Sequence, residues 1–225
     1  MRIDSHHSFS ERYTLEYLAS ILKRNRFEGS VVIAEDVADY PEFVRGIVIR
    51  ADLCDPNLPH LLDRWQLDPR FKGVCHQFDG SLPEGLAEVE RRGILLDAAA
   101  VPGVLPRMVE RCPSLRIAID HLGMGSGGAA DDQWAQDLVQ AAAFPQVFCK
   151  LSGVARLAAS ARACVQHAMA VFGPSRLMFG SDWPAGLPDT TWKASLAAFT
   201  QAIGAQSIEV REELLGGTAC RFYGL

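Results

Sequence analysis

The stretch Arg116-Ile-Ala-Ile-Asp-His121 combines a short apolar run with two polar residues that follow it directly. A second stretch, Ser30-Val-Val-Ile-Ala-Glu35, has the same character. Neither run alternates between apolar and polar residues. Near-continuous apolar runs of this length are typical of strands that are covered on both faces, as in a parallel sheet. The two stretches therefore predict buried parallel strands with polar residues at their ends.

Eight runs of this kind follow one another, and helical patterns fill most of the gaps between them. Leu15, Leu18 and Leu22, for example, lie at the spacing of one helix face. Eight strand–helix units without a strong linker predict an α/β fold, a (β/α)8 TIM barrel that forms one compact domain over residues 1–225. The predicted strands are residues 2–7, 30–35, 46–51, 71–76, 93–98, 116–121, 147–152 and 176–182, and the last predicted helices are residues 193–203 and 208–221.

An open, doubly wound sheet is the structural alternative. Such a sheet normally has a glycine-rich turn after its first strand, whereas the first run here ends in histidines. The most glycine-rich stretch, Gly123-Met-Gly-Ser-Gly-Gly128, follows the sixth run and lacks the lysine of a phosphate loop. We interpret it as a flexible loop above the mouth of a closed barrel.

The composition is that of an ordinary globular protein, with 48% hydrophobic and 22% charged residues and a net charge of −5. No basic block favours nucleic acid as a partner, and no apolar run reaches the roughly 18 residues of a membrane span. An acid and two imidazoles stand where a signal peptide would be apolar, so we expect a cytoplasmic protein with reduced cysteines. The expected partner is a small-molecule substrate, and a homodimer is the expected assembly.

Polar side chains at the ends of the strands are the candidates for chemistry, because barrel enzymes place their functional groups there. Neutral imidazoles bind zinc-like metals, and a nearby carboxylate can ligate a metal or take a proton from water. Without a metal, the carboxylate can still act as a general base while imidazole stabilises an oxyanion. The candidates are His6, His7, His76, His121 and Asp182, whereas His60 and His167 lie on predicted helices and are expected to serve packing or the surface.

Six short segments match a recurring set of motifs, in order along nearly the whole chain. The segments are Asp4-Ser-His-His-Ser-Phe9, Phe71-Lys-Gly-Val-Cys-His76, Ile119-Asp-His-Leu-Gly123, Val147-Phe-Cys-Lys-Leu-Ser-Gly153, Arg176-Leu-Met-Phe-Gly-Ser-Asp-Trp-Pro184 and Thr218-Ala-Cys-Arg-Phe-Tyr223. The two that begin at Val147 and Arg176 are the most specific. Together they resemble the amidohydrolase-related family of the amidohydrolase superfamily, in its branch of sugar lactonases and 2-pyrone-4,6-dicarboxylate hydrolases.

The resemblance implies an α/β barrel that opens cyclic esters with water. It implies that Asp182 activates the water, that His6 faces the reaction centre, and that His121 contacts the substrate or a metal. These three residues are also the candidate metal ligands. The resemblance further implies a substrate pocket whose residues are His76, Ser8, Lys150 and Trp183.

Three departures from the family pattern bear on the chemistry. Ser8 stands in place of the second histidine of the first strand, and His6 and His7 cannot replace that pair because adjacent strand residues face opposite sides. Cys75 and Met124 stand where the family has basic residues. The first change weakens a metal site, and the loss of two cations favours a neutral lactone over a dianionic pyrone.

The sequence thus predicts a hydrolase that opens a small cyclic ester with a water molecule that Asp182 activates as a base. The expected cofactor is either none or a divalent metal such as zinc. Two alternatives remain open from the residues alone. One is a zinc-dependent decarboxylase of the same superfamily. The other is a catalytically degenerate barrel that only binds a small molecule.

Overall fold

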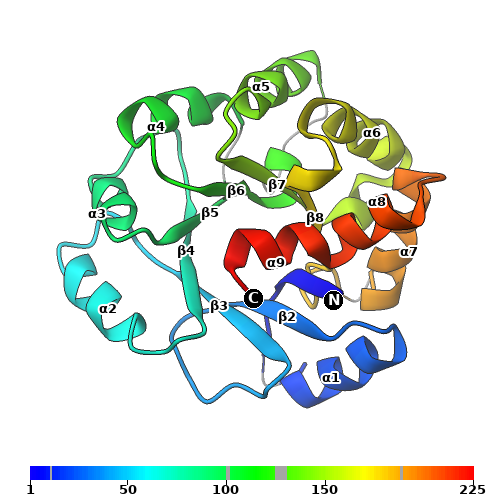
Figure 1. Cartoon of the computed structure of the whole chain (residues 1–225), viewed down its shortest axis with the longest axis horizontal. Coiled ribbons are helices and arrows are strands. Elements are labelled where there is room, and N and C mark those ends of the chain that lie inside the picture. The colour runs from blue at the N-terminus through cyan, green and yellow to red at the C-terminus, as the bar shows by residue number, and fades with distance from the viewer. Residues whose placement is uncertain (11, 100–101, 125–130, 188–189) are drawn as a thin grey trace.

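The barrel strands are all present in the computed structural model, which describes residues 1–10, 12–99, 102–124, 131–187 and 190–225. They are parallel and follow one another around a single sheet in the order β1 to β8 (Figure 1). The eight predicted strands are confirmed, with ends that shift by a few residues. The strands are β1 (Ile3–His7), β2 (Gly29–Ala34), β3 (Val44–Arg50), β4 (Phe71–Gln77), β5 (Leu95–Ala99), β6 (Ile117–Ile119), β7 (Val147–Leu151) and β8 (Leu177–Phe179).

Helices surround the strands in Figure 1 and bury their apolar faces against them. In the first helix, Leu15, Leu18 and Leu22 are the buried residues, as their spacing predicts. Residues 35–43, between β2 and β3, are fully described and contain no helix. The helices are α1 (Leu15–Arg24), α2 (Leu58–Trp65), α3 (Gly85–Arg91), α4 (Leu105–Arg111), α5 (Asp132–Ala142), α6 (Ala161–Phe172), α7 (Trp192–Ile203), α8 (Ile208–Glu212) and α9 (Thr218–Tyr223).

The seam between the first and last strands closes through the residues that follow β8. The backbone N–H of Asp182 donates to the carbonyl of His6 over 2.9 Å, and that of Ser8 donates to the carbonyl of Trp183 over 2.8 Å. His7 and Trp183 form a parallel bridge between them. The barrel is therefore closed at the carboxyl ends of its strands, where the polar candidates lie.

The inside of the barrel is filled from the opposite end by the C-terminal helix. Figure 1 shows α9 lying across the strands near the N-terminus. Phe222 and Tyr223 of this helix pack with Ile3, Val48 and Met178 in an apolar cluster inside the barrel. The helix therefore plugs this end of the barrel, and the cavity described below opens at the other end.

The single helix predicted over residues 208–221 is wrong, because the structure divides this segment. Residues 208–221 divide into α8, an irregular π-type turn over Glu213–Gly217, and α9. The break follows from close packing, because a Cβ atom on Gly216 would lie 2.1 Å from the carbonyl oxygen of Met1. The chain must bend here so that α9 can enter the barrel.

Four further expectations from the sequence can be compared with the structure. Most of the loop expected at Gly123–Gly128 lies outside the described residues, because the description stops at Met124 and resumes at 131. All six cysteines are free thiols. Among the described residues, no helix is both long enough and apolar enough to cross a membrane. His60 is exposed on α2, and His167 bonds the carbonyl of Ala135 from α6, so both are away from the barrel mouth.

Candidate active site

A cavity of about 990 Å³ opens at the carboxyl ends of the strands. Its walls come from segments far apart in the sequence. Of the predicted site residues, five line it: His6, Ser8, His76, His121 and Asp182. The convergence that the sequence analysis required is therefore present in the fold.

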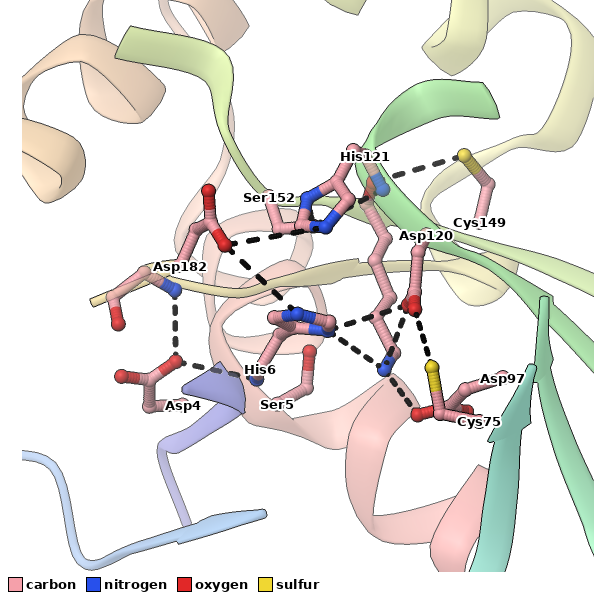
Figure 2. Close-up of polar contacts among 12 residues, drawn as sticks. Asp4, Ser5, His6, Cys75, Asp97, Asp120, His121, Cys149, Ser152 and Asp182 are labelled. Carbon is pink, nitrogen blue, oxygen red and sulfur yellow. Dashed lines mark hydrogen bonds and ion pairs between the residues drawn. The ribbon is translucent and has the colours of Figure 1, made fainter. Parts of the chain in front are cut away.

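At the floor of this cavity two imidazoles and one carboxylate point toward one another (Figure 2). The Nε2 atoms of His6 and His121 each lie 3.9 Å from Oδ1 of Asp182. The two rings meet edge to face, with centroids 4.6 Å apart. A separation of 3.9 Å is too long for a direct hydrogen bond, but one oxygen atom seated beside the three groups can contact each of them at about 2.8 Å.

The backbone turns sharply at two of these residues. His121 and Asp182 have φ angles of 52° and 58°, in the left-handed region that residues other than glycine rarely adopt. Each follows a short strand, β6 and β8, whose last residues are buried and apolar. Such strained positions cluster at functional sites because the surrounding structure must hold them. Here each turn directs the side chain of His121 or Asp182 into the cavity and away from the outer face of the barrel.

The buried carboxylate of Asp4 holds this part of the site together. Its Oδ1 accepts from the backbone N–H of Ser181 over 2.8 Å, and its Oδ2 accepts from the indole N–H of Trp192 over 2.7 Å. The backbone N–H of His6 also reaches Oδ1, at 3.4 Å. Asp4 thereby links the end of β1 to the segment that carries Asp182.

The alternation of side chains along β1 is as predicted. His7 faces away from the cavity, where its Nε2 lies 2.9 Å from the hydroxyl of Ser30. Complete burial lowers the pKa of His7, so the ring is neutral in its packed position. His6 and Ser8 share the cavity face. A metal pair of the kind formed by two histidines spaced by two residues is therefore absent, because Ser8 occupies the second position.

Two of the predicted pocket residues do not line the cavity. Lys150 is completely buried inside the barrel, and its ammonium pairs with the carboxylates of Asp97 and Asp120. Trp183 is also buried, and its ring packs against Tyr13. Both side chains therefore lie beneath or behind the cavity wall, and contact of Lys150 or Trp183 with a substrate stays a prediction.

Lys150 belongs to a buried charged cluster directly below His6. Its Nζ lies 3.0 Å from Oδ1 of Asp120 and 3.2 Å from Nδ1 of His6. The hydroxyl of Tyr223, on the plug helix, donates to Asp97 over 2.9 Å. Burial would lower the pKa of Lys150, but the charges of Asp120 and Asp97 outweigh it and raise that pKa well above its usual value. The lysine therefore remains an ammonium ion at neutral pH.

The same surroundings fix two further charges. Burial would raise the pKa of Asp120, but its neighbours, the ammonium of Lys150 first among them, outweigh it and hold that pKa well below its usual value. Burial lowers the pKa of His121 to about 3. At neutral pH, Asp120 is therefore a carboxylate and His121 a neutral imidazole.

Four charged residues of the site were not predicted as site residues from the sequence. Asp97 interrupts the apolar run of β5 and Asp120 directly precedes His121, so both left a signal in the sequence. Arg50 and Arg156 left none, because each is one of many arginines outside the matched positions. Both line the cavity, and Arg156 pairs with Oδ2 of Asp182. The cavity thus keeps two cations although Cys75 and Met124 stand where the family has basic residues, and each of the two is paired, Arg156 with Asp182 and Arg50 with Glu35.

The spacing of the ligand atoms in this site fits a divalent metal, but the positive charge of Lys150 beside them does not. Oxygen and nitrogen ligands about 2.0–2.1 Å from a zinc ion lie roughly 3.3 Å apart, close to the spacing of His6, His121 and Asp182. Ligand atoms of His6, Asp120 and His121 also lie within 4.8 Å of one another. The ammonium of Lys150, however, already contacts Asp120 and the inner nitrogen of His6. The residues therefore do not form a ready zinc site.

Comparisons with known proteins agree with this architecture. Residues 30–225 match the model of a family described as Amidohydrolase. A protein named L-fucono-1,5-lactonase from Burkholderia ambifaria is 29% identical over 214 residues, which cover 84% of this chain and 73% of the relative. A solved amidohydrolase from Burkholderia multivorans with bound zinc superposes with a TM-score of 0.84 at 22% identity, over 100% of this chain and 99% of that one. At that identity the superposition shows the fold alone.

Proposed function

We propose that this chain, which belongs to the amidohydrolase family and is a hydrolase, opens a small cyclic ester of the sugar-lactone type. The observation that carries the proposal is the single carboxylate oxygen, Oδ1 of Asp182, that faces the Nε2 atoms of His6 and His121 at equal distances of 3.9 Å. In this space Asp182 can take a proton from a water molecule while the two imidazoles polarise the carbonyl oxygen of a lactone. The relative named L-fucono-1,5-lactonase supports a lactone as substrate.

The reaction follows from the placement of these groups. Water held at Oδ1 of Asp182 gives up a proton to that oxygen as its own oxygen bonds to the carbonyl carbon of the lactone. The two imidazoles stabilise the oxyanion that develops on the former carbonyl oxygen. The ring C–O bond then breaks, and the leaving alkoxide takes the proton from Asp182. The product is an open-chain hydroxy acid.

Arg156 has a supporting part in this reaction. Its guanidinium occupies Oδ2 of Asp182, so Oδ1 is the oxygen that faces the two imidazoles. Fixing one oxygen in this way orients the other, and positioning of a catalytic group within a few tenths of an ångström strongly affects rate. Arg156 also lines the cavity, where polar groups of a substrate can reach it.

Rates of hydrolysis over a panel of sugar-type lactones test this function, with Asp182→Asn as the decisive variant. We expect loss of about 10²- to 10⁴-fold in kcat, the usual contribution of a general base. The matched control is Asp39→Asn, because Asp39 is exposed and does not line the cavity. Hydrolysis that survives Asp182→Asn at the wild-type rate would overturn the mechanism.

The same panel separates the two alternatives. A decarboxylase would leave every lactone intact and release carbon dioxide from an aromatic or unsaturated acid. A barrel that only binds its ligand would show lactone binding by calorimetry without turnover, and Asp182→Asn would then leave the result unchanged.

A further inference from the structure

Each of the two cavity imidazoles has a partner on its inner nitrogen. Nζ of Lys150 lies 3.2 Å from Nδ1 of His6. The hydroxyl of Ser152 lies 2.8 Å from Nδ1 of His121. Because the proton of a neutral imidazole sits on one nitrogen only, these inner partners decide what the outer nitrogens offer to the cavity.

The contact with Lys150 leaves no choice. An ammonium group carries three hydrogens and no lone pair, so it can only donate. Nδ1 of His6 must then be the nitrogen with the lone pair, and the ring proton must sit on Nε2. Among the described residues, Oδ1 of Asp120 lies 3.3 Å from Nδ1 of His6 and could favour the opposite arrangement, but this buried oxygen has no hydrogen-bond partner in the structure, so Nδ1 does not donate to it.

Ser152 acts in the same direction on His121. The backbone N–H of His121 donates to the Ser152 hydroxyl oxygen over 3.2 Å, which occupies one of its lone pairs. The hydroxyl hydrogen then has Nδ1 of His121 as its acceptor. This arrangement also places the ring proton of His121 on Nε2, although a hydroxyl, unlike an ammonium, can rotate to accept.

We propose that Lys150 is a positioning residue that holds His6 as its Nε2–H tautomer, so that His6 and His121 form a pair of N–H donors and the site works without a metal. The inference rests on the proposed function, because the pair serves the oxyanion of the opening lactone. Zinc ligation by His6 would need the lone pair on Nε2, and the displaced proton would then point at the Lys150 ammonium. Lys150 therefore selects donor chemistry over metal chemistry at an otherwise suitable spacing.

The tautomers can be measured directly on the unaltered, metal-free protein. Long-range ¹H–¹⁵N correlation spectra of ¹⁵N-histidine-labelled protein at neutral pH distinguish Nε2–H from Nδ1–H imidazoles. We expect His6, assigned by the loss of its signals in His6→Gln, to be an Nε2–H tautomer. An Nδ1–H tautomer would overturn the proposal. The measurement needs no substrate, so its outcome is independent of whether the lactone function is correct.

Zinc affinity gives a second, independent readout. Lys150→Met removes the ammonium, and we expect zinc to bind at least about tenfold more tightly, as followed by competition with a chromophoric chelator. Lys72→Met is the matched control, because Lys72 bonds the carbonyl of Gly224 away from the cavity. Asp97→Asn combined with Lys150→Met preserves the charge balance if the single variant does not fold. Unchanged zinc affinity in a folded variant contradicts the proposal.

Discussion

Single atoms decide the chemistry at the mouth of this barrel. Oδ2 of Asp182 is held by Arg156, and Oδ1 faces two imidazoles. Ser8 stands beside them on the cavity face of β1. A hydroxyl is a poor ligand for a divalent transition metal, whereas an imidazole is a good one. The identity of residue 8 therefore sets how much metal chemistry the same framework can support.

Ser8→His should raise zinc affinity, because it adds an imidazole two residues after His6 on the same face of the strand. We expect a gain of about tenfold or more in a chelator competition titration. Ser10→His is the control, since Ser10 is exposed and does not line the cavity. Equal affinity in Ser8→His and wild type would mean that residue 8 is not placed as described.

At the scale of elements, the sequence predicts the strands well and their cross-connections poorly. Every strand of the barrel was visible as an apolar run, because burial on both faces leaves a continuous pattern. His6, His121 and Asp182 were visible because strand ends converge in a barrel. Contacts of Lys150 and Arg156 were not, since they depend on how deep a side chain lies and on the path of an irregular segment. Neither quantity is periodic in the sequence.

The close approach of three strand ends makes Gly180 a sensitive position. A Cβ atom there would lie 2.7 Å from Cβ of His6 and 3.0 Å from Cβ of Ser152. Gly180→Ala should therefore displace His6, with a loss of about 1–3 kcal/mol in the free energy of unfolding and a clear fall in kcat. Denaturant titration and lactone kinetics measure the two effects.

Gly46→Ala provides the comparison for that variant. A Cβ atom on Gly46 meets only side-chain atoms, at 3.2 Å from Lys72 and 3.3 Å from Val31, and these can yield. We expect little change in kcat. If Gly180→Ala behaves like Gly46→Ala, the strand ends have more room than the structure indicates.

For the whole molecule, buried neutral histidines make folding sensitive to acid. The pKa of His7 is lowered from its usual 6.5 by burial, so the unfolded chain binds a proton there more readily than the folded chain. The stability that this residue contributes is present above pH 6.5 and is lost as the pH falls below it. His121, with its pKa lowered to about 3, acts with the same sign.

His7→Gln tests this pH dependence, because glutamine can keep a hydrogen bond to Ser30 without taking up a proton. Between pH 7 and pH 5 the wild type should lose up to about 2 kcal/mol relative to the variant. Asp97, whose pKa burial raises to about 6, has the opposite sign, but it is common to both proteins and cancels in the difference. Parallel pH profiles, measured by urea unfolding, would show that His7 does not contribute.

At the seam between β1 and β8, the same residues serve both the barrel closure and the candidate active site. The hydrogen bonds that complete the ring of strands run through the backbone of His6, Ser8, Asp182 and Trp183. Two of the residues that would perform the reaction, His6 and Asp182, thus also fasten the ring shut. A slip in register at this joint would therefore disable the chemistry and the architecture in one step.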